Sequence, residues 1–149
     1  MKHVQCVARV ILFSKAAALV LTSLVLAGCG DSNARPNQIS ETLSATEAVR
    51  MIAERRGNVG FAVLDVRTPE EYAPGHVTGA VNVDFSGESF RSEVDKLDKD
   101  VAYVVYCASG GRSRVASEIM GDLGFAEVYR VSSGYTALVN AGAIVSQGA

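Results

Sequence analysis

The stretch VAYVVYCASGGRS, residues 101–113, decides the fold. It begins with six apolar residues rich in Val and Tyr, as expected of a strand that is buried on both faces of a sheet. A cysteine and a turn with two glycines follow, and a helix is expected from Arg112 onward. Strands that alternate with helices form layered α/β domains, which bind their ligands at the carboxyl ends of the strands. The stretch therefore predicts an α/β domain with Cys107 at such an end.

The segments on either side continue this alternation. FAVLDV at residues 61–66 is a second apolar run, and shorter candidate strands lie at 80–83 and 127–131. Helices are expected in four segments, which cover residues 44–57, 89–97, 112–123 and 135–141. The first of them opens with the capping box Ser44-Ala45-Thr46-Glu47. We therefore expect one domain over residues 39–147, with a central parallel sheet of about five strands flanked by helices.

The first 28 residues have the pattern of a signal peptide. Three basic residues precede an apolar stretch at residues 16–27; they are Lys2, Arg9 and Lys15. A membrane-spanning helix needs about 20 apolar residues, and a span of that length here would have to include the charge of Lys15. Cleavage is therefore favoured over an uncleaved anchor. Residues 29–38 are polar and are expected to form a flexible tether.

The leader ends in Leu26-Ala27-Gly28-Cys29, which resembles the lipobox of bacterial lipoproteins. The resemblance implies that Cys29 is lipidated and becomes the mature N-terminus, so that an exported domain faces the periplasm from a membrane. The alternative is an ordinary signal peptide that is followed by a cysteine by chance. The residue after Cys29 is Gly30. An aspartate at this position would favour the inner membrane, so the glycine slightly favours the outer membrane.

The composition fits a single globular domain and argues against a nucleic-acid partner. The 149 residues are 48% hydrophobic and 20% charged, with 14 Lys and Arg against 16 Asp and Glu. Cleavage would remove the three basic residues of the leader and leave an acidic chain. It would also remove Cys6, and lipid would cap Cys29, so Cys107 would be the only free thiol in a compartment that favours disulfides.

The residues after Cys107 are suited to stabilising a thiolate. Two glycines allow the backbone to curl over the sulfur, so that amides of residues 108–112 and the start of a helix face one point. Such surroundings lower the pKa of a cysteine and make it nucleophilic. The alternative is a buried structural cysteine that packs as a small hydrophobic residue.

Two motifs resemble rhodanese-type sulfurtransferases. CASGGR, residues 107–112, is similar to the six-residue active-site loop of that family. The second motif consists of Asp65-Val66-Arg67, Glu71-Tyr72, Gly75-His76-Val77 and Gly79-Ala80-Val81-Asn82-Val83. The resemblance spans residues 39–141 and implies a rhodanese-like three-layer domain. One departure is Ser133-Gly134-Tyr135, where the family often has two glycines and then a tryptophan, and it concerns substrate fit.

The resemblance implies a sulfur-transfer reaction without a cofactor. Cys107 would accept a sulfane sulfur from a small donor such as thiosulfate, carry it as a persulfide, and pass it to cyanide or a thiol. The expected substrate- and persulfide-binding loop consists of Ala108, Ser109, Gly110, Gly111, Arg112 and Ser113. Arg112 is expected either to bind the charged end of the donor or to face water at the helix start. Ser113 is expected to cap the helix or to donate to the sulfur.

Two further groups of polar residues have candidate roles. Asp65 and Arg67 are expected to pair with each other or with Glu71 and to support the loop, a structural role rather than a catalytic one. His76 fits a turn better than a general base. Because no other histidine would remain after cleavage, ligands at suitable spacing for a zinc site are lacking and no metal is expected.

Two other functions remain open from the sequence. Cysteine phosphatases also use a thiolate in an anion-binding loop, but their signature places five residues between cysteine and arginine. Here four residues separate Cys107 from Arg112, which leaves a smaller space. The second alternative is a sulfur-relay or persulfide-binding module that acts on a partner protein. The sulfur donor also stays open, because Ala108 and Ser109 carry no charge.

Overall fold

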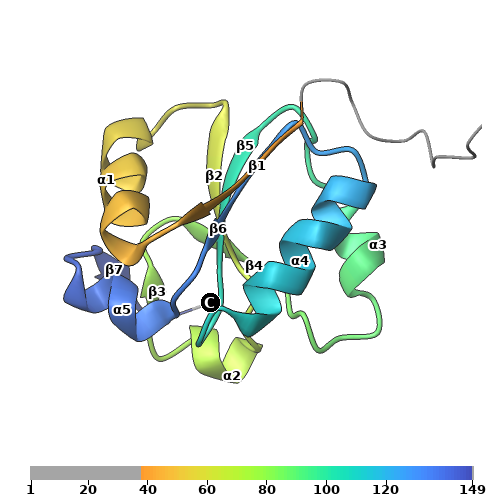
Figure 1. Cartoon of the computed structure of the whole chain (residues 1–149). Coiled ribbons are helices and arrows are strands. Elements are labelled where there is room, and N and C mark those ends of the chain that lie inside the picture. Colours follow the sequence, from red (N-terminus) through yellow and green to blue (C-terminus); the bar gives the residue numbers. More distant parts are fainter. Residues whose placement is uncertain (1–37, 149) are drawn as a thin grey trace, which may run out of the picture. The chain divides into compact units, whose positions relative to one another are not determined.

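The computed structural model describes residues 38–148, and its centre is a five-stranded parallel sheet (Figure 1). The strand order is β1-β6-β5-β2-β4, which places β5 in the middle. The strands are β1 (Ile39–Leu43), β2 (Phe61–Asp65), β4 (Ala80–Asn82), β5 (Ala102–Tyr106) and β6 (Glu127–Val131). This confirms the predicted α/β fold with a parallel sheet.

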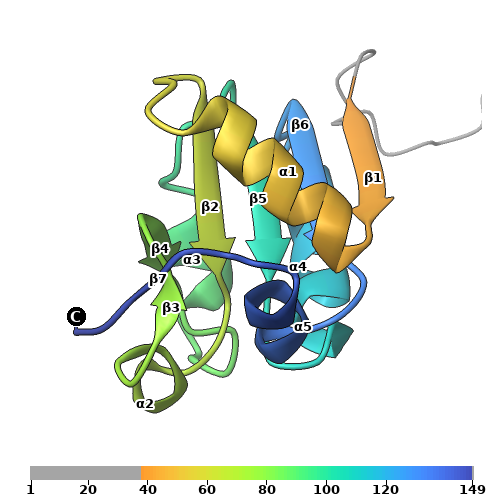
Figure 2. The same cartoon turned by 90° about the vertical axis from the view of Figure 1, so that its left-hand side faces the viewer.

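Helices cover both faces of the sheet and complete three layers. Figure 2 shows α1 (Ala45–Arg55) and α5 (Tyr135–Asn140) in front of the sheet, with α3 (Phe90–Val94) and α4 (Gly111–Asp122) behind it. One core lies between the sheet and α1 and α5, the other between the sheet and α3 and α4. Because β5 contributes side chains to both cores, all its residues are buried, as its continuous apolar run predicts.

Four small elements lie outside the expectations from the sequence. The strand β1 forms an edge of the sheet and exposes four of its five residues, so it has no apolar run. The helix α2 (Pro69–Tyr72) has only four residues. The short strands β3 (His76–Val77) and β7 (Val145–Ser146) pair antiparallel beside the main sheet.

The neighbouring strands β2 and β5 end side by side, at the edge of the sheet that is formed by the carboxyl ends of its strands. Asp65, the last residue of β2, is in register with Tyr106, the last residue of β5. This register brings the loop after β5 next to the segment after β2, which contains α2. Both motifs that resemble the rhodanese family therefore converge at this edge (Figure 1).

The predicted leader and residues 29–37 of the predicted tether, including Cys6 and Cys29, lie outside the described residues. The last residue of the tether, Gln38, donates its side-chain amide to the Gly121 carbonyl at 3.0 Å. Within residues 38–148, no helix has the length and apolar character to cross a membrane.

Candidate active site

Cys107 lies directly after β5, and the loop from Ala108 to Gly110 connects it to α4. The cysteine is only 1% exposed. Gly110 has a φ of +93°, a conformation that other L residues rarely adopt. A Cβ on Gly110 would also collide with the carbonyl oxygen of Ser132. A glycine is therefore required where the loop turns back over the sulfur.

Backbone amides surround the sulfur and favour its ionised form. The Gly110 amide donates to Cys107 Sγ at 3.1 Å. Burial is the largest single influence and raises the pKa of Cys107, but hydrogen bonds from the backbone of Ser113, Ser109 and Gly110 together lower it below its ordinary value. The Ser113 amide therefore acts together with amides of the predicted loop, residues 108–112. The thiol thus has the electrostatic surroundings of a nucleophile.

The Ser113 side chain does not cap α4. The N-cap is Gly110, and no side chain makes a capping hydrogen bond there. Ser113 Oγ instead has the carbonyl oxygens of Gly110 at 3.1 Å and Val131 at 3.2 Å within reach of its single proton, and it accepts a hydrogen bond from the Cys107 thiol at 3.8 Å. The hydroxyl thus joins the loop to β6 and borders the thiol, because it points inward from the helix start.

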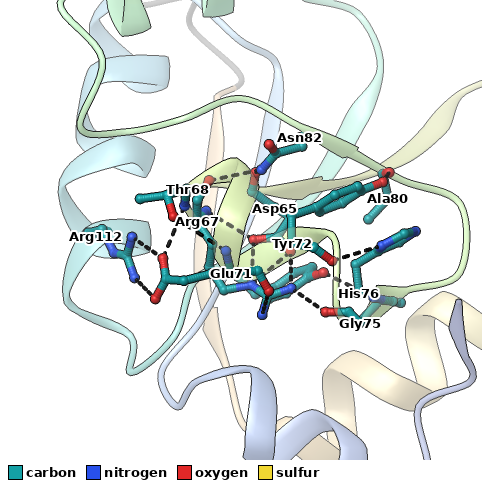
Figure 3. Close-up of polar contacts among 12 residues, drawn as sticks. Asp65, Arg67, Thr68, Glu71, Tyr72, Gly75, His76, Ala80, Asn82 and Arg112 are labelled. Carbon is teal, nitrogen blue, oxygen red and sulfur yellow. Dashed lines mark hydrogen bonds and ion pairs between the residues drawn. The ribbon is translucent and has the colours of Figure 1, made fainter. Parts of the chain in front are cut away.

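Asp65 and Arg67 form a buried ion pair at the end of β2. Arg67 Nη2 lies 2.6 Å from Asp65 Oδ2, and the two side chains are 5% and 0% exposed. Arg67 also donates to the carbonyl oxygens of Glu71 at 2.8 Å and Gly75 at 2.7 Å. Its guanidinium lies over the Tyr135 ring at 4.1 Å. These contacts fasten the α2 segment to β2 (Figure 3), a supporting role.

The helix α2 is short, and its sequence fixes where it begins. Thr68 and Glu71 form a capping box, in which the Thr68 amide donates to Glu71 Oε2 at 3.0 Å, and Pro69 occupies the first helical turn. The Glu71 carboxylate is thereby held beside the start of α4.

Glu71 binds Arg112, which settles the position of that arginine. The Nη1 and Nη2 atoms of Arg112 donate to the two Glu71 carboxylate oxygens at 2.7 and 2.8 Å (Figure 3). The hydrogen bond from Arg112 is the main cause that lowers the pKa of Glu71 to about 2. The Arg112 side chain is therefore held by a carboxylate and is only 25% exposed, while its expected contact with the charged end of the donor stays a prediction. No local pattern reveals this pair, because 41 positions separate its members.

His76 packs within the segment that follows α2. Its ring stacks on Tyr72 with a centroid distance of 3.7 Å, and its Nδ1 lies 3.2 Å from the Tyr72 carbonyl oxygen. Tyr72 in turn donates its hydroxyl to the Ala80 carbonyl at 2.7 Å. These contacts hold His76 at the start of β3, directly after the turn that follows α2.

Two tyrosines, Tyr106 and Tyr135, also contact the site, and only Tyr135 stands in a sequence motif that points to substrate fit. The Tyr135 amide donates to the Cys107 carbonyl oxygen at 2.9 Å, and Tyr106 accepts a hydrogen bond from the Val77 amide at 3.0 Å. Burial raises the pKa of Tyr106, so its hydroxyl stays neutral. Next to Tyr135, Gly134 lies so close to the Ala108 carbonyl that a Cβ would overlap it. The sequence Ser133-Gly134-Tyr135 differs from the pattern that is common in the family, but it keeps the glycine that this close approach requires.

Within the described residues, no group of three or more His, Cys, Asp and Glu side chains is placed to hold a metal ion. The group in this site with the surroundings of a nucleophile is the Cys107 thiol, with the backbone amides around it. This arrangement can stabilise a negative charge on sulfur, both on the thiolate and on a sulfur atom bonded to it.

Comparisons with known proteins agree with this geometry. Residues 44–141 match the model of the rhodanese-like domain. The thiosulfate sulfurtransferase GlpE of Pseudomonas entomophila is 32% identical over 93 residues, which cover 62% of the chain and 79% of that protein. The thiosulfate sulfurtransferase PspE of Escherichia coli is 37% identical over 65 residues, which cover 44% of the chain and 62% of that protein.

Solved structures show the same architecture. The crystal structure of a rhodanese-related protein from Thermoplasma volcanium superposes with a TM-score of 0.60 at 28% identity, covering 71% of the chain and 97% of that protein. The family match extends from the residue before α1 to the residue after α5 and includes Cys107 and the motif that starts at Asp65. The chain therefore belongs to the family of proteins with a rhodanese-like domain.

Proposed function

We propose that the protein is a sulfurtransferase that moves a sulfane sulfur from a donor such as thiosulfate to cyanide or a thiol through a persulfide on Cys107. The observation that carries this proposal is the buried thiol of Cys107 under a glycine-containing loop, with the Gly110 amide 3.1 Å from its sulfur. The names of the relatives GlpE and PspE, both thiosulfate sulfurtransferases, support it.

The proposed reaction transfers one sulfur atom in two steps, first onto Cys107 and then onto the acceptor. The Cys107 thiolate attacks the outer sulfur of thiosulfate, the S–S bond of thiosulfate breaks, and sulfite leaves with the electron pair. The product is a persulfide anion, whose charge the amides of the loop stabilise. The acceptor then attacks the terminal sulfur, so cyanide becomes thiocyanate and the Cys107 thiolate returns.

The geometry favours this reaction over phosphate-ester hydrolysis. A phosphatase needs its arginine for the phosphoryl oxygens, whereas both terminal nitrogens of Arg112 are bonded to Glu71. The next position holds Ser113, which is buried and bonded to backbone carbonyls. Neither residue is arranged to hold a tetrahedral phosphoryl group.

A protein acceptor is the second candidate for the second step. Ala108 and Ser109 at the tip of the loop are exposed, whereas Cys107 is buried. A thiol on a partner protein would have to approach across this tip, as a small acceptor does. Release of the bound sulfur to cyanide or a small thiol would indicate an enzyme that acts on small molecules. Release only to a protein thiol would indicate a sulfur relay.

Mass spectrometry provides the direct test. The purified protein, incubated with thiosulfate and then desalted, should gain the mass of one sulfur atom, and cyanide should remove it as thiocyanate. Cys107→Ser should abolish both results, because a serine hydroxyl is not ionised near neutral pH and cannot carry sulfane sulfur. Cys29→Ser is the matched control and should load normally. A protein that takes no sulfur from any donor but hydrolyses aryl phosphates would refute the proposal.

We also propose that the domain acts at a membrane surface in the periplasm. The basic leader and the sequence Leu26-Ala27-Gly28-Cys29 support this location. A lipid on Cys29 would anchor the domain through the polar residues 30–38.

A further inference from the structure

The two arginines beside the Cys107 loop are both bound to carboxylates. Arg67 is buried against Asp65, and Arg112 holds Glu71 through two hydrogen bonds of 2.7 and 2.8 Å. These four side-chain charges cancel. A negatively charged sulfur donor that approaches Cys107 therefore meets backbone amides, while the positive charge of each of these arginines is already compensated.

We propose that Glu71 is a specificity-determining residue: by holding Arg112 it weakens the binding of the dianion thiosulfate relative to sulfur donors that carry less negative charge. The inference rests on the proposed sulfur transfer by Cys107 and adds the selection between donor classes. Glu71 acts here through Arg112 as a positioning residue.

Arg112 is close enough to the site to affect an anion there. It precedes Ser113, whose hydroxyl lies 3.8 Å from Cys107 Sγ. Its pKa is raised mainly by the hydrogen bond to Glu71, and the charge of Cys107 contributes in the same direction. The Arg112 side chain is 25% exposed, so its charge borders both the loop and solvent. An arginine in this position would attract an anionic donor if its charge were not already compensated.

Glu71 is held in place independently of Arg112. Its Oε2 atom accepts a hydrogen bond from the Thr68 amide at 3.0 Å, and its own amide donates to Thr68 Oγ1 at 3.4 Å. The carboxylate therefore competes for Arg112 from a fixed position and adds its own repulsion toward a dianion. Glu71→Gln removes the negative charge while it keeps the size of the side chain and an oxygen that can accept from Thr68.

The test compares two sulfur donors that differ by one charge. Thiosulfate and the methanethiosulfonate anion both present a terminal sulfur on an oxidised sulfur atom, but the first is a dianion and the second a monoanion. In Glu71→Gln we expect the KM for thiosulfate to fall about threefold to tenfold, a range set by partly exposed charge interactions. The kcat for both donors should change by less than about twofold. Because the monoanion carries half the charge, the KM for methanethiosulfonate should fall only by about the square root of the thiosulfate factor, about twofold to threefold. High salt should reduce the gain.

Two further variants separate charge from structure. Glu118→Gln removes the partner of Arg114 on the same helix, where Arg114 Nη1 lies 2.7 Å from Glu118 Oε1 in an exposed pair. This variant makes the same change of charge away from the loop and should leave both KM values unaltered. Glu71→Asp keeps the negative charge and should keep the weak binding of thiosulfate. In Glu71→Gln, the additional substitution Arg112→Gln should cancel the gain.

A binding measurement keeps this inference distinct from the proposed function. Cys107→Ser cannot take up sulfur, so a titration with thiosulfate followed by the backbone amide NMR signals of residues 108–113 reports binding alone. Adding Glu71→Gln to Cys107→Ser should lower the Kd for thiosulfate, whether or not the unaltered protein transfers sulfur. An unchanged or higher Kd, or an equal loss of kcat for both donors in Glu71→Gln, would show that Glu71 only holds the fold together and would overturn the inference.

Discussion

The reactivity of Cys107 depends on opposing effects at a single atom. Burial disfavours a charged sulfur, whereas the amides of Ser113, Ser109 and Gly110 favour it. The result is a lowered pKa in a site where the thiol is only 1% exposed. Because the stabilising groups are mainly backbone amides, the loop conformation controls the nucleophile more than any single charged side chain does.

The first prediction concerns the pH dependence of this thiol. Only the thiolate reacts with iodoacetamide, so the rate of alkylation should rise as the pH passes the pKa of Cys107, with a midpoint below that of free cysteine. Ser113→Ala removes a side-chain hydrogen bond that lowers the pKa of Cys107, so the midpoint should move up. The slower reaction of this variant at neutral pH follows from its smaller thiolate fraction.

A nearby serine provides the control for that measurement. Ser117 lies one turn further along α4, is also buried, and donates to the Arg114 carbonyl at 2.7 Å. Ser117→Ala should leave the midpoint unchanged. A midpoint at or above that of free cysteine in the unaltered protein would contradict the predicted ionisation.

The second prediction concerns the buried ion pair. Asp65→Asn leaves the guanidinium of Arg67 buried without its counter-charge, and loss of one partner of such a pair costs about 3–5 kcal/mol in the free energy of unfolding, measured by urea titration. Asp95→Asn is the matched control, because it breaks an exposed pair with Lys99 at 2.7 Å and should lower stability much less. Equal losses in the two variants would show that burial adds nothing to the Asp65–Arg67 pair.

At the scale of elements, burial decides what the sequence could predict. The strand β5 packs on both faces, so its apolar run is continuous, and the turn that follows contains the glycines that its geometry requires. The edge strand β1 is mostly exposed and gains its strand conformation from pairing with β6, which no local pattern of residues 39–43 encodes.

The same reasoning applies to the site. The backbone amides around the Cys107 sulfur belong to residues close to it in the sequence, so the residues of CASGGR indicate this arrangement directly. The pair of Glu71 and Arg112 depends on α2 and α4 meeting at the sheet edge, and the position of Tyr135 depends on α5 following β6. These contacts between segments far apart in the chain require the three-dimensional structure.

The third prediction tests the connection between β5 and α4. Gly110→Ala places a Cβ at a positive φ, which costs about 1–2 kcal/mol, and also against the Ser132 carbonyl. It should lower stability and slow the alkylation of Cys107, because the turn that aims the Gly110 amide at the sulfur is disturbed. Gly111→Ala is the control, since a Cβ there meets open space and φ is not positive. Equal effects of the two substitutions would contradict this account of the loop.

For the whole molecule, the fold places the reactive thiol at one edge of the sheet, between the two helical layers. The described residues contain one cysteine, Cys107, whereas Cys6 and Cys29 lie outside them. If the leader is cleaved and Cys29 is lipidated, the mature chain has a single free thiol in an oxidising compartment. The proposed location thus bears on the chemistry, because a persulfide on Cys107 would face no second thiol of its own chain.

The fourth prediction tests that location. Protein extracted from membranes should have a mass that corresponds to a chain starting at Cys29 with attached acyl groups, because the sequence Leu26-Ala27-Gly28-Cys29 has the pattern of a lipidation site. Each buried methylene of an acyl chain contributes about 0.8 kcal/mol, so several chains hold the domain firmly at the surface. Cys29→Ser removes the attachment point and should prevent acylation while Cys107 still loads sulfur. A chain that retains Met1, or an unmodified chain in the soluble fraction, would contradict lipidation and leave the sulfur chemistry of Cys107 untouched.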